Sequence, residues 1–275
     1  MEVITHPDEM AARCRSLRRS GRRIGFVPTM GYLHRAHSSL MELTRPDCDV
    51  LVVSIYVNPL QFLPGEDLAR YPRDPEGDRQ RCEDAGCDLL FFPESLYPPG
   101  FVTRVAVPAL SQRWEGAARP GHFEGVATVV SRLFGIVSPD LATFGEKDYQ
   151  QLAVIEALVE DLYLPVNVRR GPLVRDDDGL ALSSRNVYLS PTERRRATSL
   201  SRALAHLAAH PSRSSAERIA AAAEMIDADE LDYLAVVDPR SLEPIPDVVA
   251  GARALVAARY GRTRLLDNIA VDTPE

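Results

Sequence analysis

The chain has 275 residues, of which 45% are hydrophobic, and a formal net charge of −7 from 32 Lys+Arg against 39 Asp+Glu. This length suits one large domain or two modest ones whose core needs no disulfide, and Cys14, Cys48, Cys82 and Cys87 form no C-x-x-C pair. No apolar run approaches the roughly 18 residues of a membrane span, the first residues lack the features of a secretory signal, and the acidic balance argues against nucleic acid. We therefore expect a cytoplasmic protein with reduced cysteines, no membrane or nucleic-acid partner, and room for a small anionic ligand.

Short apolar runs alternate with helix-like stretches through the first part of the chain. Pro7 at a first helical position and Gly21 after a basic pair bracket an opening helix. The run 49–57, D-V-L-V-V-S-I-Y-V, is almost continuously apolar, as in a parallel strand covered on both faces. The other predicted strands are 23–27, 88–92, 141–144 and 166–169, and the other predicted helices are 36–44, 75–85, 123–137 and 150–162. This alternation predicts an α/β fold, a Rossmann-like, doubly wound parallel sheet.

The pattern changes after Pro172. Helical stretches at 192–209 and 214–226 precede the predicted strands 231–237, 254–259 and 263–266. Helices followed by strands without alternation predict a smaller α+β domain. We place the boundary near 172–175, which divides the chain into domains 1–173 and 174–275.

The first candidate site is P-T-M-G-Y-L-H-R-A-H, residues 28–37, between a predicted strand and its helix. Ligands of open α/β sheets collect outside the carboxyl ends of the strands. His34 and His37 can share a face at the helix entry and add to its positive end, which suits phosphate. Histidines that only cap or pack are an equal alternative for an isolated H-x-x-H. A metal is less favoured because no third ligand stands at a convincing spacing.

Two further motifs offer neutral and basic hydrogen-bonding groups. In S-I-Y-V-N-P-L-Q-F, residues 54–62, the amides of Asn58 and Gln61 suit hydroxyl and carboxylate oxygens, although the motif alone is more typical of an Asn-Pro turn. In R-P-G-H-F-E-G-V, residues 119–126, Arg119 and His122 either serve the same pocket or form a salt-bridged loop.

The motif F-G-E-K-D-Y-Q-Q, residues 144–151, contains the single lysine of a chain with 31 arginines. An ammonium is a compact point charge and a guanidinium a planar fork, so we expect that Lys147 is retained for chemistry, the alternative being a chance survivor of arginine bias. Gly145 permits close backbone approach, Asp148 can bind ribose hydroxyls, and Gln151 lies one helical turn beyond Lys147. Glu146 is expected to cap the helix or face solvent.

The last motif is R-D-D-D-G-L-A-L-S-S-R-N, residues 175–186, at the predicted domain boundary. Ser183, Ser184 and Arg185 combine two hydroxyls with a guanidinium, which suits pyrophosphate oxygens in a loop that can close over a nucleotide. A helix N-cap is the alternative for these residues. For Asp176–Asp178 a solvated turn ending in Gly179 is favoured over a metal site.

The order of H-x-x-H, G-E-K-D and S-S-R resembles the nucleotidyl-transfer superfamily with HIGH and KMSKS signatures, whereas neither a Walker A loop nor G-x-G-x-x-G is present. With Y-P-R at 71–73 and R-L-L-D-N at 264–268, the set resembles the pantothenate synthetase (pantoate:beta-alanine ligase) family from about residue 20 to residue 268. Another HIGH-type nucleotidyltransferase and a non-catalytic nucleotide-binding module are the alternatives.

The resemblance implies an ATP-dependent ligase that works in two steps. The carboxylate of (R)-pantoate attacks the α-phosphorus of Mg-ATP, giving pantoyl adenylate and pyrophosphate, and the amine of beta-alanine then displaces AMP. Residues 1–173 would bind ATP and pantoate, and 174–275 would form a lid in a homodimer. Mg²⁺ would be bound by oxygens of ATP and by water. The resemblance names no protein ligand for it, and Asp78 is the one candidate considered.

The resemblance also implies roles for individual residues. The implied ATP-binding residues are Met30, Gly31, Tyr32, Leu33, His34, Arg35, Ala36, His37, Gly145, Glu146, Lys147, Asp148, Val174, Leu182, Ser183, Ser184 and Arg185. The implied catalytic residues are His34 and His37 on the phosphates, with His37 as proton donor, Lys147 at the α-phosphate, and Arg185 on the departing pyrophosphate. Val174 would bind adenine through its backbone. Pantoate would contact Gln61 and Gln151, supported by Asn58 and Met30, and Gln61 would also lie near beta-alanine.

Two positions depart from the family pattern. Ala36 stands where H-x-G-H is usual and adds a methyl group beside the nucleotide backbone contacts. We expect a modest change in ATP affinity from it. Leu182 replaces a frequent methionine of similar volume, which puts little in doubt.

Overall fold

The structure is a computed structural model that describes residues 1–273, and the chain within it divides into two compact units. The first unit comprises 1–112, 119–146 and 151–172, and the second comprises 113–118, 147–150 and 173–275. Two short segments that precede residue 172 in the chain, 113–118 and 147–150, therefore belong to the second unit. The division into domains 1–173 and 174–275 stays a prediction.

The first unit is built on a six-stranded, all-parallel sheet in the order β1-β4-β3-β2-β5-β6. Its strands are β1 (Glu2–Ile4), β2 (Ile24–Thr29), β3 (Val50–Ile55), β4 (Leu89–Phe91), β5 (Leu141–Gly145) and β6 (Asn167–Gly171). From β2 the chain runs outward through β3 to β4, then returns to the other side of β2 with β5 and β6. The predicted doubly wound sheet is confirmed. The edge strand β1 was not predicted, because three residues are too few to show a periodicity.

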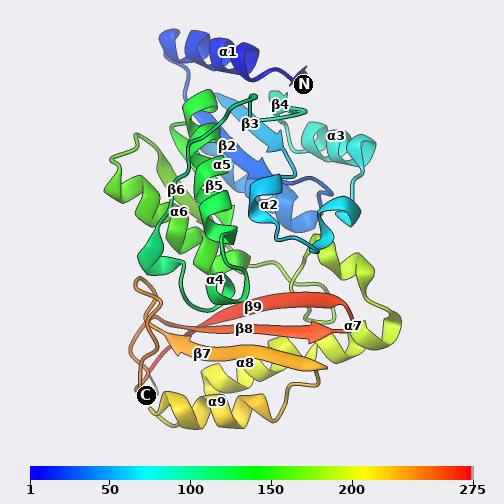
Figure 1. Ribbon diagram of the computed structural model, residues 1–275, viewed down its shortest axis with the longest axis vertical. Helices are drawn as coiled ribbons and strands as arrows, with labels where there is room; N and C mark the ends of the chain where they lie inside the picture. The colour runs from blue at the N-terminus through cyan, green and yellow to red at the C-terminus, as the bar shows by residue number, and fades with distance from the viewer. Residues whose placement is uncertain (274–275) are drawn as a thin grey trace. The chain divides into compact units, whose positions relative to one another are not determined.

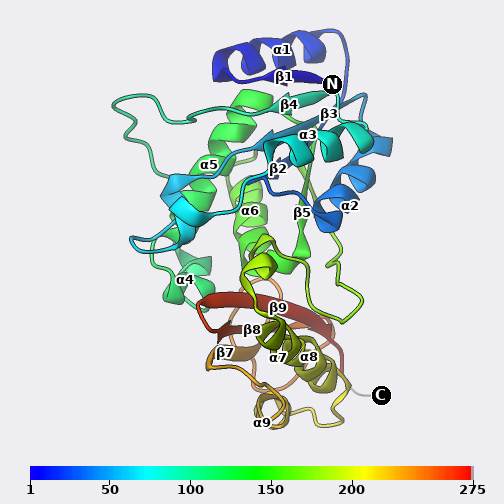
Figure 2. The same cartoon turned by 90° about the vertical axis from the view of Figure 1, so that its right-hand side faces the viewer.

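Helices cover both faces of this sheet (Figures 1 and 2). They are α1 (Pro7–Arg19), α2 (Arg35–Thr44), α3 (Pro75–Asp84), α5 (His122–Val137) and α6 (Tyr149–Asp161). Turned on its side, the sheet has α2 and α3 on one face and α1, α5 and α6 on the other (Figure 2). The opening helix begins at Pro7 as predicted, with acidic residues in its first turn and Arg18 and Arg19 in its last.

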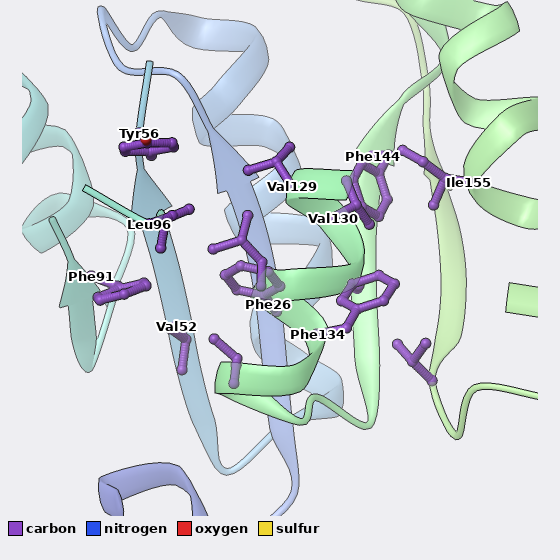
Figure 3. Packing of buried hydrophobic residues seen from close by; sticks show 14 of the residues in the cluster. Phe26, Val52, Tyr56, Phe91, Leu96, Val129, Val130, Phe134, Phe144 and Ile155 are labelled. Atoms are coloured by element: carbon purple, nitrogen blue, oxygen red, sulfur yellow. The ribbon is translucent and has the colours of Figure 1, made fainter. Parts of the chain in front are cut away.

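Alternation along the strands divides the apolar side chains between the two faces. Phe26 of β2 belongs to the larger cluster, with Val52, Phe91 and Phe134, and Figure 3 shows this packing against α5. The next residue, Val27, belongs to the cluster beneath α2 and α3. Every residue of β3 is buried, as expected for a parallel strand covered on both faces.

The second unit contains a three-stranded antiparallel sheet, β7 (Glu230–Val237), β8 (Ala252–Tyr260) and β9 (Thr263–Val271). Its helices are α4 (Glu115–Ala118), α7 (Pro191–Ala197), α8 (Ser199–Ala209) and α9 (Ser215–Ala223), of which α8 and α9 lie along one face of the sheet (Figure 1). Leu204 of α8 shares a core cluster with Val256 of β8. The single helix predicted over 192–209 was wrong, because the chain breaks it at Thr198 into α7 and α8.

Within residues 1–273, no helix combines the length and the apolar character needed to cross a lipid bilayer.

Candidate active site

The loop after β2 passes through the left-handed backbone region at two successive residues. Gly31 has φ 84° and Tyr32 has φ 51°, both in the left-handed region. A Cβ on Gly31 would lie 2.8 Å from Cγ2 of Ile55, so a larger residue would clash as well as strain the backbone. The glycine of P-T-M-G-Y-L-H is therefore required for the course of the loop.

Asp78 of α3 holds this loop through both carboxylate oxygens. Oδ2 accepts a hydrogen bond from the amide of Tyr32 at 2.9 Å, and Oδ1 accepts one from the amide of Leu33 at 2.6 Å. Only 3% of Asp78 is exposed, and this burial raises the pKa of its carboxyl despite the two amide donors. The structure thus gives Asp78 a supporting role for the loop, and its ligation of a metal stays a hypothesis from the sequence.

His34 and His37 lie side by side at the start of α2. His34 is the N-cap residue and His37 the third helical residue, and their ring centroids are 4.1 Å apart. Nδ1 of His37 accepts a hydrogen bond from the amide of His34 at 3.2 Å. A neutral His37 ring therefore carries its proton on Nε2. The shared face predicted from H-x-x-H is present, next to the positive end of a helix.

Asn58 and Gln61, predicted to share a site, are in direct contact after β3. Nδ2 of Asn58 donates to Oε1 of Gln61 at 3.0 Å and to the carbonyl of Gly125 at 3.0 Å. Its Oδ1 accepts from the amide of Leu60 and from the hydroxyl of Tyr97 at 2.8 Å. The hydrogen-bonding capacity of the Asn58 side chain is thus used within the protein, which holds Gln61 in one orientation.

The other end of the Gln61 amide reaches the loop after β2. Nε2 of Gln61 donates to the sulfur of Met30 at 3.0 Å. A thioether is a weak acceptor, so a bound oxygen atom could replace it as the partner of Nε2 at little cost. The group that suits a carboxylate therefore lies at the entrance of the loop that suits a phosphate.

Arg119 and His122 anchor the backbone of Gln61. The carbonyl of Gln61 accepts a hydrogen bond from Nη2 of Arg119 at 3.0 Å and lies 2.8 Å from Nδ1 of His122. Arg119 also makes two hydrogen bonds of 2.7 Å to the carboxylate of Glu66. Burial raises the pKa of Glu66, but the hydrogen bonds and charge of Arg119 outweigh it and leave that pKa below its usual value. The alternative of a salt-bridged loop is confirmed, and this loop supports the Asn58–Gln61 pair, whereas a role of Arg119 and His122 toward a ligand stays a prediction.

Gly125 lets helix α5 approach this pair closely. A Cβ at Gly125 would lie 2.2 Å from the carbonyl oxygen of Leu60 and 2.6 Å from the amide nitrogen of Gln61. The glycine of G-H-F-E-G-V is thus explained by backbone packing.

Lys147 lies in the second unit, in the short segment 147–150. About 20% of its side chain is exposed, and its ammonium lies 3.3 Å from Oδ1 of Asp148. Its carbonyl accepts a hydrogen bond from Nδ2 of Asn268 on β9 at 2.8 Å. Gly145 and Glu146 remain with the first unit, where Glu146 lies 3.9 Å from Arg170, and Gln151 is half-buried in α6.

The loop 174–186 is held within the second unit by its own hydrogen bonds and by β9. The amide of Leu182 donates to the carbonyl of Val174 at 3.0 Å. Arg175 makes a two-pronged ion pair of 2.6 and 2.9 Å with Asp267. Oγ of Ser183 accepts from the amide of Arg185 and begins a 3₁₀ helix at Ser184–Tyr188, so the capping alternative is confirmed for Ser183.

The acidic run within this loop forms the predicted turn. Gly179 has φ 87°, and its amide donates to the carbonyl of Asp176 at 2.9 Å. Asp176 and Asp178 both pair with Arg194 at 2.7 and 2.9 Å. These carboxylates neutralise a guanidinium of α7.

Sequence reasoning missed several residues that hold the site residues in place. Asp267 and Asn268 were used only as part of the family motif R-L-L-D-N, and Asp78 was considered only as a metal ligand. The available signal was weak, since only an adjacent Asp-Asn pair after a predicted apolar strand sets these positions apart. Their partners lie 92 and 121 residues away in the sequence, and no local pattern reveals such pairs.

These features define the class of protein. An open parallel sheet whose polar groups gather after β2 and β3 is the arrangement of a ligand-binding α/β enzyme. Residues 2–270 match the family model described as Pantoate-beta-alanine ligase. The chain therefore belongs to the pantoate-beta-alanine ligase family, and it is a ligase that joins pantoate to beta-alanine with ATP.

Relatives and solved structures agree with this family over nearly the whole chain. A pantothenate synthetase of Thermus thermophilus is 56% identical over 90% of this chain and 93% of its own length, and one of Rhizorhabdus wittichii is 50% identical over 99% of both. A crystal structure of pantothenate synthetase from Thermus thermophilus superposes with a TM-score of 0.94, at 52% identity over 99% of this chain and all of that one. The pantoate-beta-alanine ligase of Francisella tularensis, complexed with beta-gamma ATP and beta-alanine, gives 0.82 at 32% identity over 98% and 97%.

The ion pair beneath Gln61 predicts a pH-dependent contribution to stability. The lowered pKa of Glu66 stabilises the fold at any pH above the pKa of this carboxyl in the unfolded chain, about 4.3. This contribution is lost as the pH falls through the lower pKa of the same group in the folded protein. Glu66→Gln should lower the free energy of unfolding at pH 7 by about 1 to 3 kcal/mol, since Arg119 loses a charged partner. Urea titrations from pH 7 to pH 3 should show the two proteins converging in acid. The exposed Glu94→Gln is the control, and a constant difference at every pH would contradict the assignment.

Proposed function

We propose that this ligase activates pantoate as pantoyl adenylate before beta-alanine attacks. The observation that carries the proposal is the 3.0 Å contact between Nε2 of Gln61 and the sulfur of Met30. It puts an amide donor for a carboxylate beside a loop that ends in two histidines at a helix N-terminus. Attack of a carboxylate oxygen on an α-phosphorus needs this juxtaposition.

In the first step a carboxylate oxygen of pantoate forms a bond to the α-phosphorus, and the bond to the β-phosphate oxygen breaks to release pyrophosphate. In the second step the amine of beta-alanine attacks the acyl carbon, and AMP departs with the oxygen that pantoate supplied. Charge builds up on phosphate oxygens in the first step. Positioned cations and hydrogen-bond donors can therefore supply most of the catalysis.

We assign the roles in the first unit as follows. His34 and His37 contact the phosphates, with Nε2–H of His37 as the proton donor that its hydrogen bond to the His34 amide favours. Gln61 and Gln151 bind pantoate, and Gln61 also lies near beta-alanine. The remaining nucleotide contacts come from Gly145 at the end of β5, from Glu146 after it, and from the backbone of the loop and the following helical turn at Met30, Gly31, Tyr32, Leu33, Arg35 and Ala36. Asn58 acts through Gln61, because its own side-chain groups bind protein atoms.

In the second unit, Lys147 stabilises the charge at the α-phosphate, and Asp148 binds ribose. Ser183, Ser184 and Arg185 hold the departing pyrophosphate, with Leu182 beside them. Val174 binds adenine through its backbone. The hydrogen bond from Leu182 to the Val174 carbonyl supports this last role, because it fixes the peptide planes on both sides of the loop.

Mg²⁺ is proposed to enter with ATP, bound by phosphate oxygens and water. Among residues 1–273, no three or more His, Cys, Asp or Glu side chains gather in a group that could hold a metal ion. Mg²⁺ commonly takes substrate phosphates and waters as ligands, so the donors present suit an ion that arrives on the nucleotide. When bound, the ion would neutralise phosphate charge.

The remaining proposals concern assembly and location. We propose a homodimer, as the family implies, with residues 1–173 as the ATP- and pantoate-binding domain and 174–275 as a lid. The net charge of −7 supports the absence of a nucleic-acid partner, and four free thiols suit the cytoplasm. No membrane partner is proposed.

The two-step order can be tested with isotope-labelled pantoate. Purified enzyme with Mg-ATP and pantoate should release pyrophosphate before beta-alanine is added, and AMP and pantothenate should appear only after its addition. Pantoate carrying ¹⁸O in its carboxylate should transfer one ¹⁸O to AMP, as mass spectrometry can show. Label in inorganic phosphate, with ADP as the other product, would instead indicate an acyl phosphate and overturn the proposal.

The single lysine gives a second prediction. Lys147→Arg should lower kcat/KM by about 10²- to 10³-fold, the scale for losing one preorganised charge-stabilising group, while circular dichroism and Tm stay near wild type. The planar guanidinium cannot put the same point charge at the α-phosphate. Arg195→Lys on exposed α7 is the charge-conserving control. A fully active Lys147→Arg enzyme would remove Lys147 from the mechanism.

The departure at Ala36 gives a third prediction. Ala36 is the second residue of α2, between the two histidines, and its methyl group lies next to the proposed nucleotide contacts. Ala36→Gly should change the KM for ATP less than about fivefold, which corresponds to under about 1 kcal/mol, and leave the enzyme active. Ala216→Gly, at the second position of α9, matches the backbone change away from the site. An unchanged KM for ATP would show that the methyl group does not influence the nucleotide.

A further inference from the structure

The segment that carries Lys147 is fastened to the second unit by side chains. Asn268 of β9 donates to the carbonyl of Lys147 at 2.8 Å. The hydroxyl of Tyr149 donates to the carbonyl of Pro239 at 3.1 Å, and the amide of Gln150 donates to the carbonyl of Arg113 at 2.9 Å. Lys147 follows β5 closely in sequence, yet these contacts fix its backbone to the small antiparallel sheet and its neighbours.

Asn268 is itself fixed by a buried arginine. Nε of Arg253 on β8 donates to Oδ1 of Asn268 at 2.7 Å. The guanidinium of Arg253 also lies over the ring of Tyr149, 4.5 Å from its centroid. Asn268 is 3% exposed and Arg253 is 9% exposed, so the hydrogen bonds of Asn268 to Arg253 and to Lys147 lie away from bulk water. Low local dielectric strengthens such bonds and makes their loss costly.

The donors and acceptors on either side of residue 268 require an amide side chain at this position. Arg253 offers only donors, so the oxygen of the Asn268 amide faces it. The nitrogen then faces the Lys147 carbonyl, which offers only an acceptor. An aspartate could keep the bond to Arg253, but it would bring a carboxylate oxygen against the carbonyl of Lys147.

The residue before Asn268 performs a parallel task on the opposite side of the strand. Successive residues of a strand point to opposite faces. Asp267 makes the two-pronged ion pair with Arg175, which belongs to the loop that leads to Ser183–Arg185. Asn268 thus binds the backbone of the segment that carries Lys147, and Asp267 binds a side chain of the loop that leads to Ser183–Arg185.

We infer that Asn268 is a positioning residue for the ligase reaction, which acts by holding Lys147 through its backbone carbonyl. This inference rests on the proposed role of Lys147. Asn268 touches no reacting atom in this account. Its contribution is the placement of the ammonium, and a misplacement of about 1 Å can cost about 10²-fold in rate.

Two substitutions separate the parts of the contact. Asn268→Asp keeps the shape and the acceptor for Arg253 but removes the donor to Lys147, and Asn268→Ala removes both. We expect Asn268→Asp to lower kcat about 10²-fold with little change in the KM for pantoate. Tm should fall because the carbonyl of Lys147 loses its buried donor, but circular dichroism should show an intact fold because the Arg253 contact persists. Thr263→Val, buried on the same strand, is the matched control and should keep wild-type kinetics.

The single lysine provides a readout that does not depend on turnover. Protein grown with ¹³Cε-lysine should show one side-chain signal, that of Lys147, which ATP shifts in the wild type and in Thr263→Val. In Asn268→Asp this shift should shrink or disappear. An unchanged ATP-induced shift together with wild-type kcat in Asn268→Asp would overturn the inference.

The Lys147→Ala background distinguishes failure of the inference from failure of the proposed function. If Asn268 acts through Lys147, Asn268→Asp adds no further loss of kcat to Lys147→Ala. An equal further loss in that background overturns the positioning role and leaves the proposed function intact. Wild-type activity in Lys147→Ala alone overturns the role of Lys147, and the inference fails with it.

Discussion

The constraint on which the first unit depends is that a parallel sheet must be covered on both faces. Every residue of β3 is buried, and Phe26 and Val27 of β2 enter separate apolar clusters on opposite faces. A charged side chain along these strands would lose its hydration at a high cost. Chemistry is therefore displaced to the carboxyl ends of the strands, where the Met30 loop follows β2 and Asn58 follows β3.

Loops at the end of such a sheet need supports of their own, and these supports are buried polar groups whose hydrogen bonds are satisfied. Asp78 holds the amides of Tyr32 and Leu33, and Arg119 holds the carbonyl of Gln61. In both cases the support binds backbone, so the side chains of the loop remain available for substrate. The cost of burying the groups is visible in the raised pKa of Asp78, and its two amide donors reduce that cost.

The sequence predicts the layers of the fold well, because the periodicity that identifies a helix or strand is read from neighbouring residues. It predicts poorly which side chains hold the site residues in place, because those hydrogen bonds join residues far apart in the sequence. The apolar run at 49–57 and the Pro7 to Gly21 bracket each contain enough residues to identify an element. β1 has only three residues, and the break at Thr198 interrupts a stretch of uniform helix-like composition. For the site, the motifs predicted that Asn58 lies with Gln61 and that His34 lies with His37, and the contacts confirm both pairs. Their roles toward substrates remain proposals, and the ties of Asp78 and Asn268 to distant backbone could not be read from spacing.

Lys147 is the single lysine of a chain with 31 arginines, and its backbone is held by buried side chains. Adenylate formation asks a protein mainly to hold charges where phosphate charge develops, with little covalent chemistry of its own. A flexible ammonium does this only if its backbone is held, since the side chain spans several rotatable bonds. In the second unit the carbonyl of Lys147 is bonded to Asn268, whose amide is oriented by Arg253, and Arg253 in turn packs on Tyr149 two residues after the lysine. This series of contacts therefore begins and ends on the segment 147–150. Asn268, Arg253 and Tyr149 thus supply the precise placement that one compact charge requires. Two of them, Asn268 and Arg253, lie on strands to which the sequence motifs alone assign no chemical role.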